Sequence, residues 1–224
     1  MLTPPQRHDL LFLTPEGREL AWLSREEGPE WDGSCWTDFP GVPAICTGRT
    51  REGAPELLRV GFSFPRRKNG VRCRLAGWVP LRTVVWTVTP WEAAWGGKPL
   101  TGAFGTCFRR LQRAAQTAGV PFGLFGSSAL ARATGLPYLH PGSDLDILLG
   151  AAPPAALERF ARAAEEIQRA SGVRVDGEVR IDSGRYLKFR ELFLGQDTVL
   201  VKGGPQPQLL SRREALRALE ASIS

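Results

Sequence analysis

The sequence predicts an α+β protein in which a small N-terminal domain, mainly β or mixed, precedes a mixed β-sheet with flanking helices. A length of 224 residues is enough for two modest domains with separate cores. Apolar residues make up 42% of the chain and charged residues 23%, as in soluble globular proteins. The composition also changes near residue 86, from a segment rich in Trp, Pro and Gly to alternating helix and strand patterns. We therefore divide the chain into residues 1–86 and 87–224.

Short apolar runs between turn signals predict strands in the N-terminal part, at residues 10–13 and 57–64. The dipeptide Asn69-Gly70 favours a two-residue hairpin turn. Five basic residues surround this turn: Arg66, Arg67, Lys68, Arg72 and Arg74. They form either a solvated surface hairpin or a binding surface for an acidic partner.

A connection between the domains is predicted around residues 87–99, where Pro90, Trp91 and Trp95 precede or flank a Gly-Gly pair. Beyond it, apolar residues at helical spacing predict a helix that begins near Phe104 and ends at Gly119. Further helices are predicted at residues 127–133, after Pro153-Pro154, and after the capping box of Ser211 and Glu214, and strands at 120–125, 145–149, 173–181, 186–189 and 198–202.

Charge and cysteine content narrow the class of protein. The net charge of +6 favours polyanionic partners such as phosphates, nucleic acid or an acidic protein. The four cysteines contain no Cys-x-x-Cys pair, so buried free thiols are expected in place of a zinc site. No stretch approaches the roughly 20 apolar residues of a membrane span, and residues 1–9 lack the order of a secretion signal. We expect a cytoplasmic protein without a membrane partner.

The segment Phe125-Gly126-Ser127-Ser128 leaves a predicted buried strand and enters a helix. Glycine permits close approach of the backbone to a ligand, and amides at a helix N-terminus favour anions. Gly126 and Ser127 are therefore candidates for binding a phosphate, although an ordinary strand-to-helix turn has the same composition.

Two carboxylates follow at Asp144 and Asp146, at the start of the apolar run Leu145–Leu149. Residues two positions apart on a strand point to the same side, so we expect both acids to face one site. Two unpaired carboxylates repel each other, and a hard divalent cation relieves that repulsion. The alternative is a strand entry with exposed acids, but the apolar neighbours argue for a buried strand.

A third acid would complete a site for two metal ions. Along residues 173–181 the charged side chains alternate with apolar ones, so Asp176 and Glu178 are both candidates, and alternation cannot separate them. A solvent-facing row of charges is the alternative for either residue. Candidate groups for substrate phosphates are Lys188, Arg190 and Lys202.

Two metals held by three carboxylates suit phosphoryl or nucleotidyl transfer. Mg²⁺ or Mn²⁺ is the expected cofactor, and Asp144 and Asp146 the expected catalytic residues. A nucleotidyltransferase acting on nucleic acid or another protein, and a non-catalytic nucleic-acid-binding module, are the alternatives. Because Lys and Arg are spread through the chain, we do not expect nucleic acid as the partner. His8 and His140 are expected to be ordinary surface or capping residues.

A Gly-Ser turn before a helix, an Asp-x-Asp pair on the next strand and an acid on a later strand resemble the polymerase-β-type nucleotidyltransferases. Within that superfamily, Phe125 to Leu130, Thr134-Gly135-Leu136-Pro137-Tyr138-Leu139 and Ser143 to Asp146 resemble the malonate decarboxylase holo-acyl-carrier-protein synthases, also called phosphoribosyl-dephospho-CoA transferases. The resemblance continues at Arg7 to Leu11 and at Asp176-Gly177-Glu178, Arg190-Glu191 and Leu200-Val201-Lys202.

The resemblance implies a nucleotidyltransferase-type catalytic domain at 87–224 and a carrier- or substrate-recognition domain at 1–86. It implies transfer of the prosthetic group from 2'-(5''-triphosphoribosyl)-3'-dephospho-CoA to a serine of the apo acyl-carrier subunit of malonate decarboxylase, with release of diphosphate. The family's metal ligands correspond to Asp144 and Asp146, and its Gly-Ser element to Gly126 and Ser127. Tyr186-Leu187-Lys188-Phe189 departs from the family's more apolar stretch, which weakens a catalytic role for Lys188. The basic residues at 66–74 would steer an acidic carrier.

Overall fold

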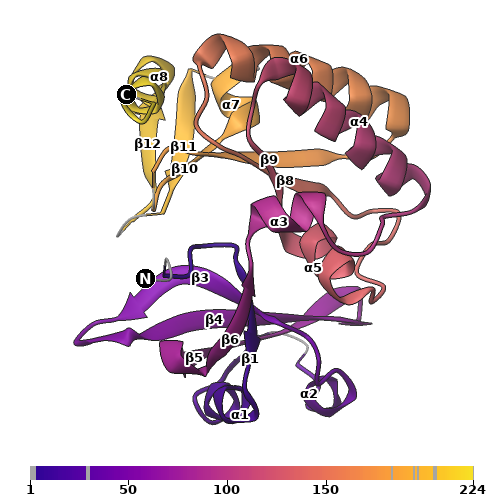
Figure 1. The fold of residues 1–224 in the computed structure, drawn as a ribbon, viewed down its shortest axis with the longest axis vertical. Coiled ribbons are helices and arrows are strands. Elements are labelled where there is room, and N and C mark those ends of the chain that lie inside the picture. The colour runs from indigo at the N-terminus through magenta and orange to yellow at the C-terminus, as the bar shows by residue number, and fades with distance from the viewer. Residues whose placement is uncertain are drawn as a thin grey trace.

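The structure is a computed structural model that describes residues 4–28, 31–182, 184–193, 195, 197–203 and 206–223. Within these residues the strands form two six-stranded sheets, one in each half of the chain, with helices on their faces (Figure 1). The predicted α+β class is confirmed. The first sheet ends two residues beyond the predicted boundary at residue 86.

The first sheet is antiparallel throughout, in the order β2-β5-β4-β3-β1-β6. Its strands are β1 (Leu10–Leu13), β2 (Glu26–Glu27), β3 (Ala44–Arg51), β4 (Ala54–Lys68), β5 (Val71–Pro80) and β6 (Val84–Val88), with a 3-10 helix at Leu81–Thr83 before the last strand. The strands predicted at 10–13 and 57–64 are confirmed, the second as part of the longer β4.

Each face of this sheet has its own environment, because side chains alternate along a strand. On β4, Val60, Phe62 and Phe64 are buried against α1 (Pro15–Leu23) and α2 (Ser34–Asp38), while Gly61 and Ser63 point to the opposite face. The two helices lie on the outer side of the sheet in Figure 1. The opposite face therefore remains available to the second half of the chain.

The predicted hairpin turn joins β4 to β5 at Asn69 and Gly70. Both residues have positive φ, 50° and 77°, as a two-residue turn of the hairpin type requires. The turn lies at one end of the sheet, where Arg67 and Lys68 beside it are exposed.

The second sheet runs in the order β12-β11-β10-β9-β8-β7. Its strands are β7 (Phe122–Leu124), β8 (Leu145–Leu149), β9 (Val175–Arg180), β10 (Tyr186–Lys188), β11 (Thr198–Lys202) and β12 (Gln208–Ser211). Only β8 and β9 are paired in parallel. This parallel pairing brings the acids of two different strands into register.

Helices cover both faces of the second sheet. The long helices α4 (Gly102–Ala118) and α6 (Pro154–Ser171) lie together on the outer face, and α3 (Pro90–Trp95) and α5 (Gly126–Thr134) lie between the two sheets (Figure 1). Gly119 and Gly135 end α4 and α5 with φ of 72° and 76°, the left-handed conformation that favours glycine. The capping box of Ser211 and Glu214 opens α8 (Arg212–Ala221), as predicted.

The sequence alone did not predict α1, α2, β2, β3, α7 (Phe189–Phe193) or β12, and of these the short α2, α7 and β12 follow no strong local pattern. The region expected to be a simple connection contains the end of β6 and helix α3. Pro90 and Trp91 pack there so closely on Gly123 that a Cβ at this glycine would lie 2.9 Å from the Trp91 ring.

The segment from Thr134 to Leu139 connects the two halves of the chain through hydrogen bonds of Tyr138. Tyr138 is 1% exposed, and its hydroxyl donates to the carbonyl oxygen of Ser63 on β4 over 2.8 Å. In return, the Arg72 guanidinium on β5 donates to the carbonyl oxygen of Tyr138 over 2.7 Å. This reciprocal pair fixes the inner face of the first sheet opposite α5.

The four cysteines are buried free thiols, as expected. Among the described residues, no helix combines the length and apolar character needed to cross a membrane.

Replacing Tyr138 by Phe should lower the free energy of unfolding by about 1 kcal/mol, because the buried Ser63 carbonyl loses its donor. Tyr186→Phe is the matched control: its buried hydroxyl has no hydrogen-bond partner among the described residues, so its removal should leave stability unchanged or raise it. Urea unfolding of both variants measures the difference, and equal effects would contradict the proposed fastening role.

A second prediction concerns Asp9, which is 4% exposed beside the first strand. Burial raises the pKa of this carboxyl to about 6, although a bond from the Gln6 amide opposes the shift. A raised pKa means that the folded state binds the proton more tightly, so this contribution to stability is present at low pH and is lost as pH rises through 6.

The free energy of unfolding of Asp9→Asn should therefore rise relative to that of the parent protein as pH increases, by about 1 kcal/mol at pH 4.5 and by about 3 kcal/mol at pH 7.5. Chemical unfolding at several pH values measures this difference. A difference that does not change with pH would show that Asp9 does not titrate in this range.

Candidate active site

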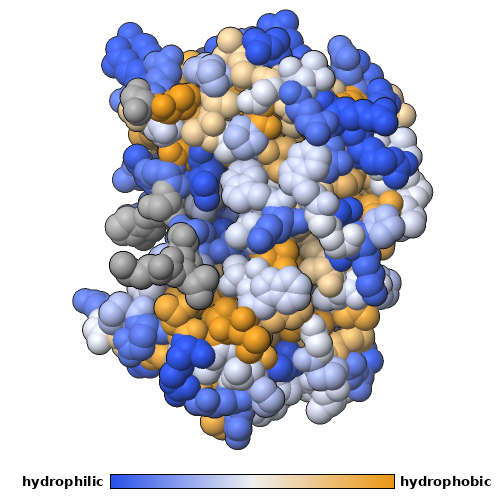
Figure 2. Space-filling view, in the orientation of Figure 1, coloured by the Kyte–Doolittle hydropathy of each residue, from blue (hydrophilic) through white to orange (hydrophobic). Residues whose placement is uncertain are grey.

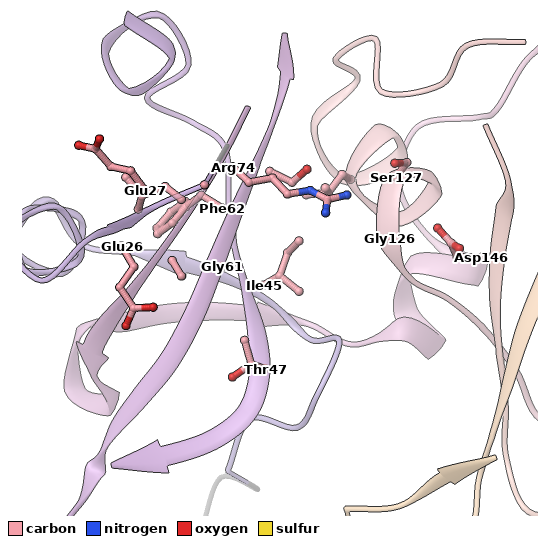
Figure 3. A pocket seen from close by; sticks show the side chains of 15 residues that line it. Glu26, Glu27, Ile45, Thr47, Gly61, Phe62, Arg74, Gly126, Ser127 and Asp146 are labelled. Carbon is pink, nitrogen blue, oxygen red and sulfur yellow. The ribbon is translucent and has the colours of Figure 1, made fainter. Parts of the chain in front are cut away.

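A cleft between the inner face of the first sheet and helix α5 holds two adjoining cavities, of about 480 and 410 Å³. Arg74, Ser127 and Asp146 line both cavities. Figure 3 shows the first cavity, with the Arg74 side chain extending from β5 toward Ser127 and Asp146 on the opposite wall. The predicted Gly-Ser turn and acid pair therefore meet at the centre of this cleft.

Glycine is required at the start of α5. Gly126 has a φ of 60°, and a Cβ at this position would clash with Oδ2 of Asp146. Its absence lets the helix begin directly beside the carboxylate, and the backbone N–H of Ser127 donates to Asp146. The first turn of α5 thus offers its amide groups to an anion next to Asp146.

Negative charge is concentrated around Asp146. Burial, together with the neighbouring charges of Asp176 and Asp144, raises the pKa of this carboxyl to about 7, against the opposing effects of the Lys188 charge and the Ser127 amide. Carboxylates that repel one another in a partly buried cleft are a suitable oxygen donor set for Mg²⁺ or Mn²⁺. The residues present therefore fit the expected cation.

Asp144 directly precedes β8, one residue outside the strand. It lines the second cavity together with Asp146, so both acids face that cavity. The Arg174 guanidinium holds Asp144 through two bonds, one of them 2.8 Å from Nη2 to Oδ2. Arg174 was not among the candidates, because only the pairing of β8 with β9 brings it there.

The register of the parallel strands separates the two candidates for the third acid. Asp146 lies directly opposite Asp176, whereas Glu178 lies opposite Leu148. Lys188 Nζ contacts Asp176 Oδ2 at 2.5 Å. Asp144, Asp146 and Asp176, here called the carboxylate cluster, therefore belong together. As they stand, no three acids, histidines or cysteines in the described part of the chain are close enough to enclose an ion.

Glu178 belongs to a different network. Its carboxylate is bound by His8 Nε2 and by Lys202 Nζ, each at 3.1 Å, and Arg7 lies 3.9 Å away. Burial alone would raise its pKa, but the His8 bond and the neighbouring positive charges hold the pKa down to about 2. Glu178 thus joins the N-terminal segment to the second sheet. Because Glu178 is 2% exposed, the alternative of a solvent-facing charge is excluded for this residue.

His8 is a largely enclosed contact between the two halves, with 10% of its side chain exposed, and the expectation of an ordinary surface or capping residue was wrong. Its ring packs on Phe125 with centroids 4.1 Å apart, and its φ of 77° is rare outside glycine. The tertiary contact with Glu178 overrides the local preference. His140 accepts a bond from the amide of Gly142, a local capping role, and also lines the second cavity.

The predicted phosphate-binding residues fall into two groups. Gly126 and Ser127 line the cleft. Lys202 is paired with Glu178, and Arg190 on α7 contacts Gln168 and Glu165 of α6 at 3.0 and 3.5 Å. Neither of these two basic residues lines the two cavities beside Asp146.

The basic residues around the hairpin also differ in role. Arg72 is 6% exposed and donates a hydrogen bond to the carbonyl oxygen of Tyr138, so it is not available on the surface to bind a carrier protein. Arg66 pairs with Asp38 at 2.7 Å and with Asp32 at 3.5 Å. Arg67 and Arg74 line the second cavity, and Lys68 is exposed near the hairpin tip.

Comparison with known proteins shows that both parts of the chain match models of one protein family. The family model described as the phosphoribosyl-dephospho-CoA transferase MdcG C-terminal domain matches residues 99–213, and that of the N-terminal domain matches residues 6–90. No solved structure matches significantly.

Curated relatives with the name phosphoribosyl-dephospho-CoA transferase align over nearly the whole chain. The relative from Bradyrhizobium diazoefficiens is 26% identical over 98% of this chain and 96% of its own length. The relative from Pseudomonas aeruginosa is 29% identical over 97% of both chains. With both domain models matched in order, the chain belongs to the phosphoribosyl-dephospho-CoA transferase family and is a transferase enzyme.

Proposed function

We propose that this protein transfers the phosphoribosyl-dephospho-CoA group from 2'-(5''-triphosphoribosyl)-3'-dephospho-CoA to a serine of the apo acyl-carrier subunit of malonate decarboxylase, releasing diphosphate. The observation that carries the proposal is the contact of Asp146 with the glycine-dependent start of α5. It joins an anion-binding turn to a carboxylate cluster inside one cleft.

In this proposal Asp144, Asp146 and Asp176 hold Mg²⁺ or Mn²⁺. The cation supplies charge neutralisation for the phosphates and lowers the pKa of the attacking hydroxyl. The serine oxygen forms a bond to the α-phosphorus, the hydroxyl proton is lost, and the bond from that phosphorus to the diphosphate oxygen breaks. The amide of Gly126 and the hydroxyl of Ser127 bind phosphate oxygens, which fixes the phosphorus relative to the cluster.

The carrier would reach the cleft past the β4–β5 hairpin. Lys68 is exposed there, and Arg67 and Gly70 at the same end of the sheet line the second cavity. Exposed positive charge beside the mouth of the site would steer an acidic carrier toward it. The proposal places the reaction in the cytoplasm, where the four buried thiols remain reduced.

Asp146→Asn should abolish transfer, because the neutral side chain cannot hold a cation beside the Ser127 turn. The measurement is the intact mass of a serine-bearing apo carrier subunit after incubation with the enzyme, the triphosphoribosyl donor and magnesium. The matched control is Asp197→Asn, since Asp197 is exposed and lies outside both cavities.

The parent enzyme and the control should both add the mass of the phosphoribosyl-dephospho-CoA group. Transfer by the Asp146 variant at the parent rate would contradict the metal role. Transfer from an ordinary nucleoside triphosphate, but not from the triphosphoribosyl donor, would contradict the proposed substrate.

Lys68→Glu should raise the KM for the carrier several-fold at low salt and leave the KM for the donor unchanged. The reason is that a charge at the rim of the site changes the rate at which the carrier and the enzyme associate. Arg159→Glu on α6 carries the same change of charge at an exposed position on the outer helical layer. Steady-state kinetics at low and high salt compare the two. Equal carrier KM values in both variants would exclude steering by the hairpin.

A further inference from the structure

The two cavities of the cleft differ in character. The cavity of about 410 Å³, here called the basic lobe, contains Arg67, Arg72, Arg74 and His140 opposite Asp144 and Asp146. The cavity of about 480 Å³, here called the apolar lobe, lies between the inner face of the first sheet and α5. Ile45, Gly61 and Ala76 of the sheet and Leu130 of α5 line it.

We propose that the donor binds across both lobes, with its triphosphate in the basic lobe against Arg74 and its adenosine in the apolar lobe. The inference rests on the proposed function for the identity of the donor. It assigns donor binding to the first sheet as well as to the catalytic domain, and makes Arg74 a phosphate-binding residue.

Arg74 has the position and the freedom that this role requires. It lines both lobes, and in Figure 3 its guanidinium extends across the cleft toward Ser127. Among the described residues no carboxylate forms an ion pair with it, unlike Arg66 or Arg59 on the neighbouring strand. A guanidinium binds phosphate oxygens through two parallel bonds, so Arg74 can hold the diphosphate from the side opposite the cluster.

The apolar lobe suits an uncharged group. Its wall includes aliphatic side chains and glycine beside the hydroxyls of Thr47 and Ser63, and Arg74 at the junction is its one basic residue among those described. Of its three acids, Asp146 lies at the junction with the basic lobe, whereas Glu26 pairs with Arg59 and Glu27 pairs with Arg25 at 3.0 Å. A phosphate placed here would lose hydration without gaining a partner, whereas a purine loses little.

Covalent connectivity selects adenosine over the rest of the donor. The triphosphate is carried by the added ribose, and that ribose is attached at the 2' position of the adenosine. The adenosine is therefore the neutral group nearest the phosphates, and the lobe that adjoins the phosphate site through Arg74, Ser127 and Asp146 is the one within its reach.

Gly61 allows a direct test, because it lines the apolar lobe and a Cβ added there meets nothing within 4 Å. Gly61→Leu should fill the lobe without disturbing the fold. Gly41→Leu is the matched control, since Gly41 is equally unobstructed and lies outside both lobes. For the basic lobe, Arg74→Gln is compared with Arg51→Gln, an exposed position on β3 away from the cleft.

The experiment measures the Kd values of adenosine and of magnesium diphosphate by calorimetry for the parent and the four variants. Gly61→Leu should weaken adenosine binding about tenfold and leave diphosphate binding unchanged, since about 1.4 kcal/mol of lost contact corresponds to that factor. Arg74→Gln should weaken diphosphate binding by about tenfold or more and leave adenosine binding unchanged. Both controls should bind like the parent.

Unchanged adenosine binding in Gly61→Leu, unchanged diphosphate binding in Arg74→Gln, or no adenosine binding by the parent at millimolar concentration would each overturn the assignment. Thermal melts of all variants show whether a loss reflects misfolding. Because neither probe requires the carrier, the binding pattern can hold while transfer to the malonate decarboxylase carrier fails, and that result would reject only the proposed acceptor.

Discussion

The close contact between Gly126 and Asp146 is the constraint on which the rest of the site depends. The Ser127 amide stabilises the carboxylate of this aspartate beside the helix start, yet burial, and after it the two neighbouring carboxylates, raise its pKa to about 7. Such a charge arrangement is costly unless the site has a use for it. The contact fixes the strand that carries the acids relative to the turn that carries the amides. The geometry of the candidate site thus depends on the absence of a Cβ at Gly126.

The first sheet completes the cleft, and its position is held by buried polar contacts. Tyr138 and Arg72 exchange hydrogen bonds with backbone carbonyls across the junction, and His8 joins the N-terminal segment to Glu178 on β9. Such contacts require exact partners, so they specify one orientation better than an apolar interface of the same area would. The orientation brings Arg74 opposite the carboxylate cluster. The domain that was expected to recognise the carrier therefore also forms a wall of the active site.

Local signals predicted most of the fold, and tertiary contacts explain what they missed. Apolar spacing and a terminal glycine predicted α4, and the apolar run after Asp144 predicted β8 to the residue. The placements of Asp176 and Glu178 depend on strand register and on the segment packed over β9, which alternation does not contain. For the same reason the sequence alone could not distinguish Arg72 from Arg74. In the structure Arg72 is buried against Tyr138, whereas Arg74 is exposed in the cleft. Residue type and spacing predicted the pair of Asp144 and Asp146, whereas the third acid and the roles of the basic residues depended on the fold.

The balance of charge in the cleft explains why donor binding should require a cation. Arg174 neutralises Asp144 and Lys188 neutralises Asp176, whereas Asp146 forms no ion pair among the described residues. A triphosphate placed against Ser127 would meet this carboxylate at close range, and like charges in a partly buried site repel each other strongly. A divalent cation held by Asp146 would replace that repulsion with attraction, because carboxylate and phosphate oxygens both bind such a cation. The carboxylate that makes the empty cleft unfavourable for a polyanion is therefore the same group that makes the polyanion and its metal bind together.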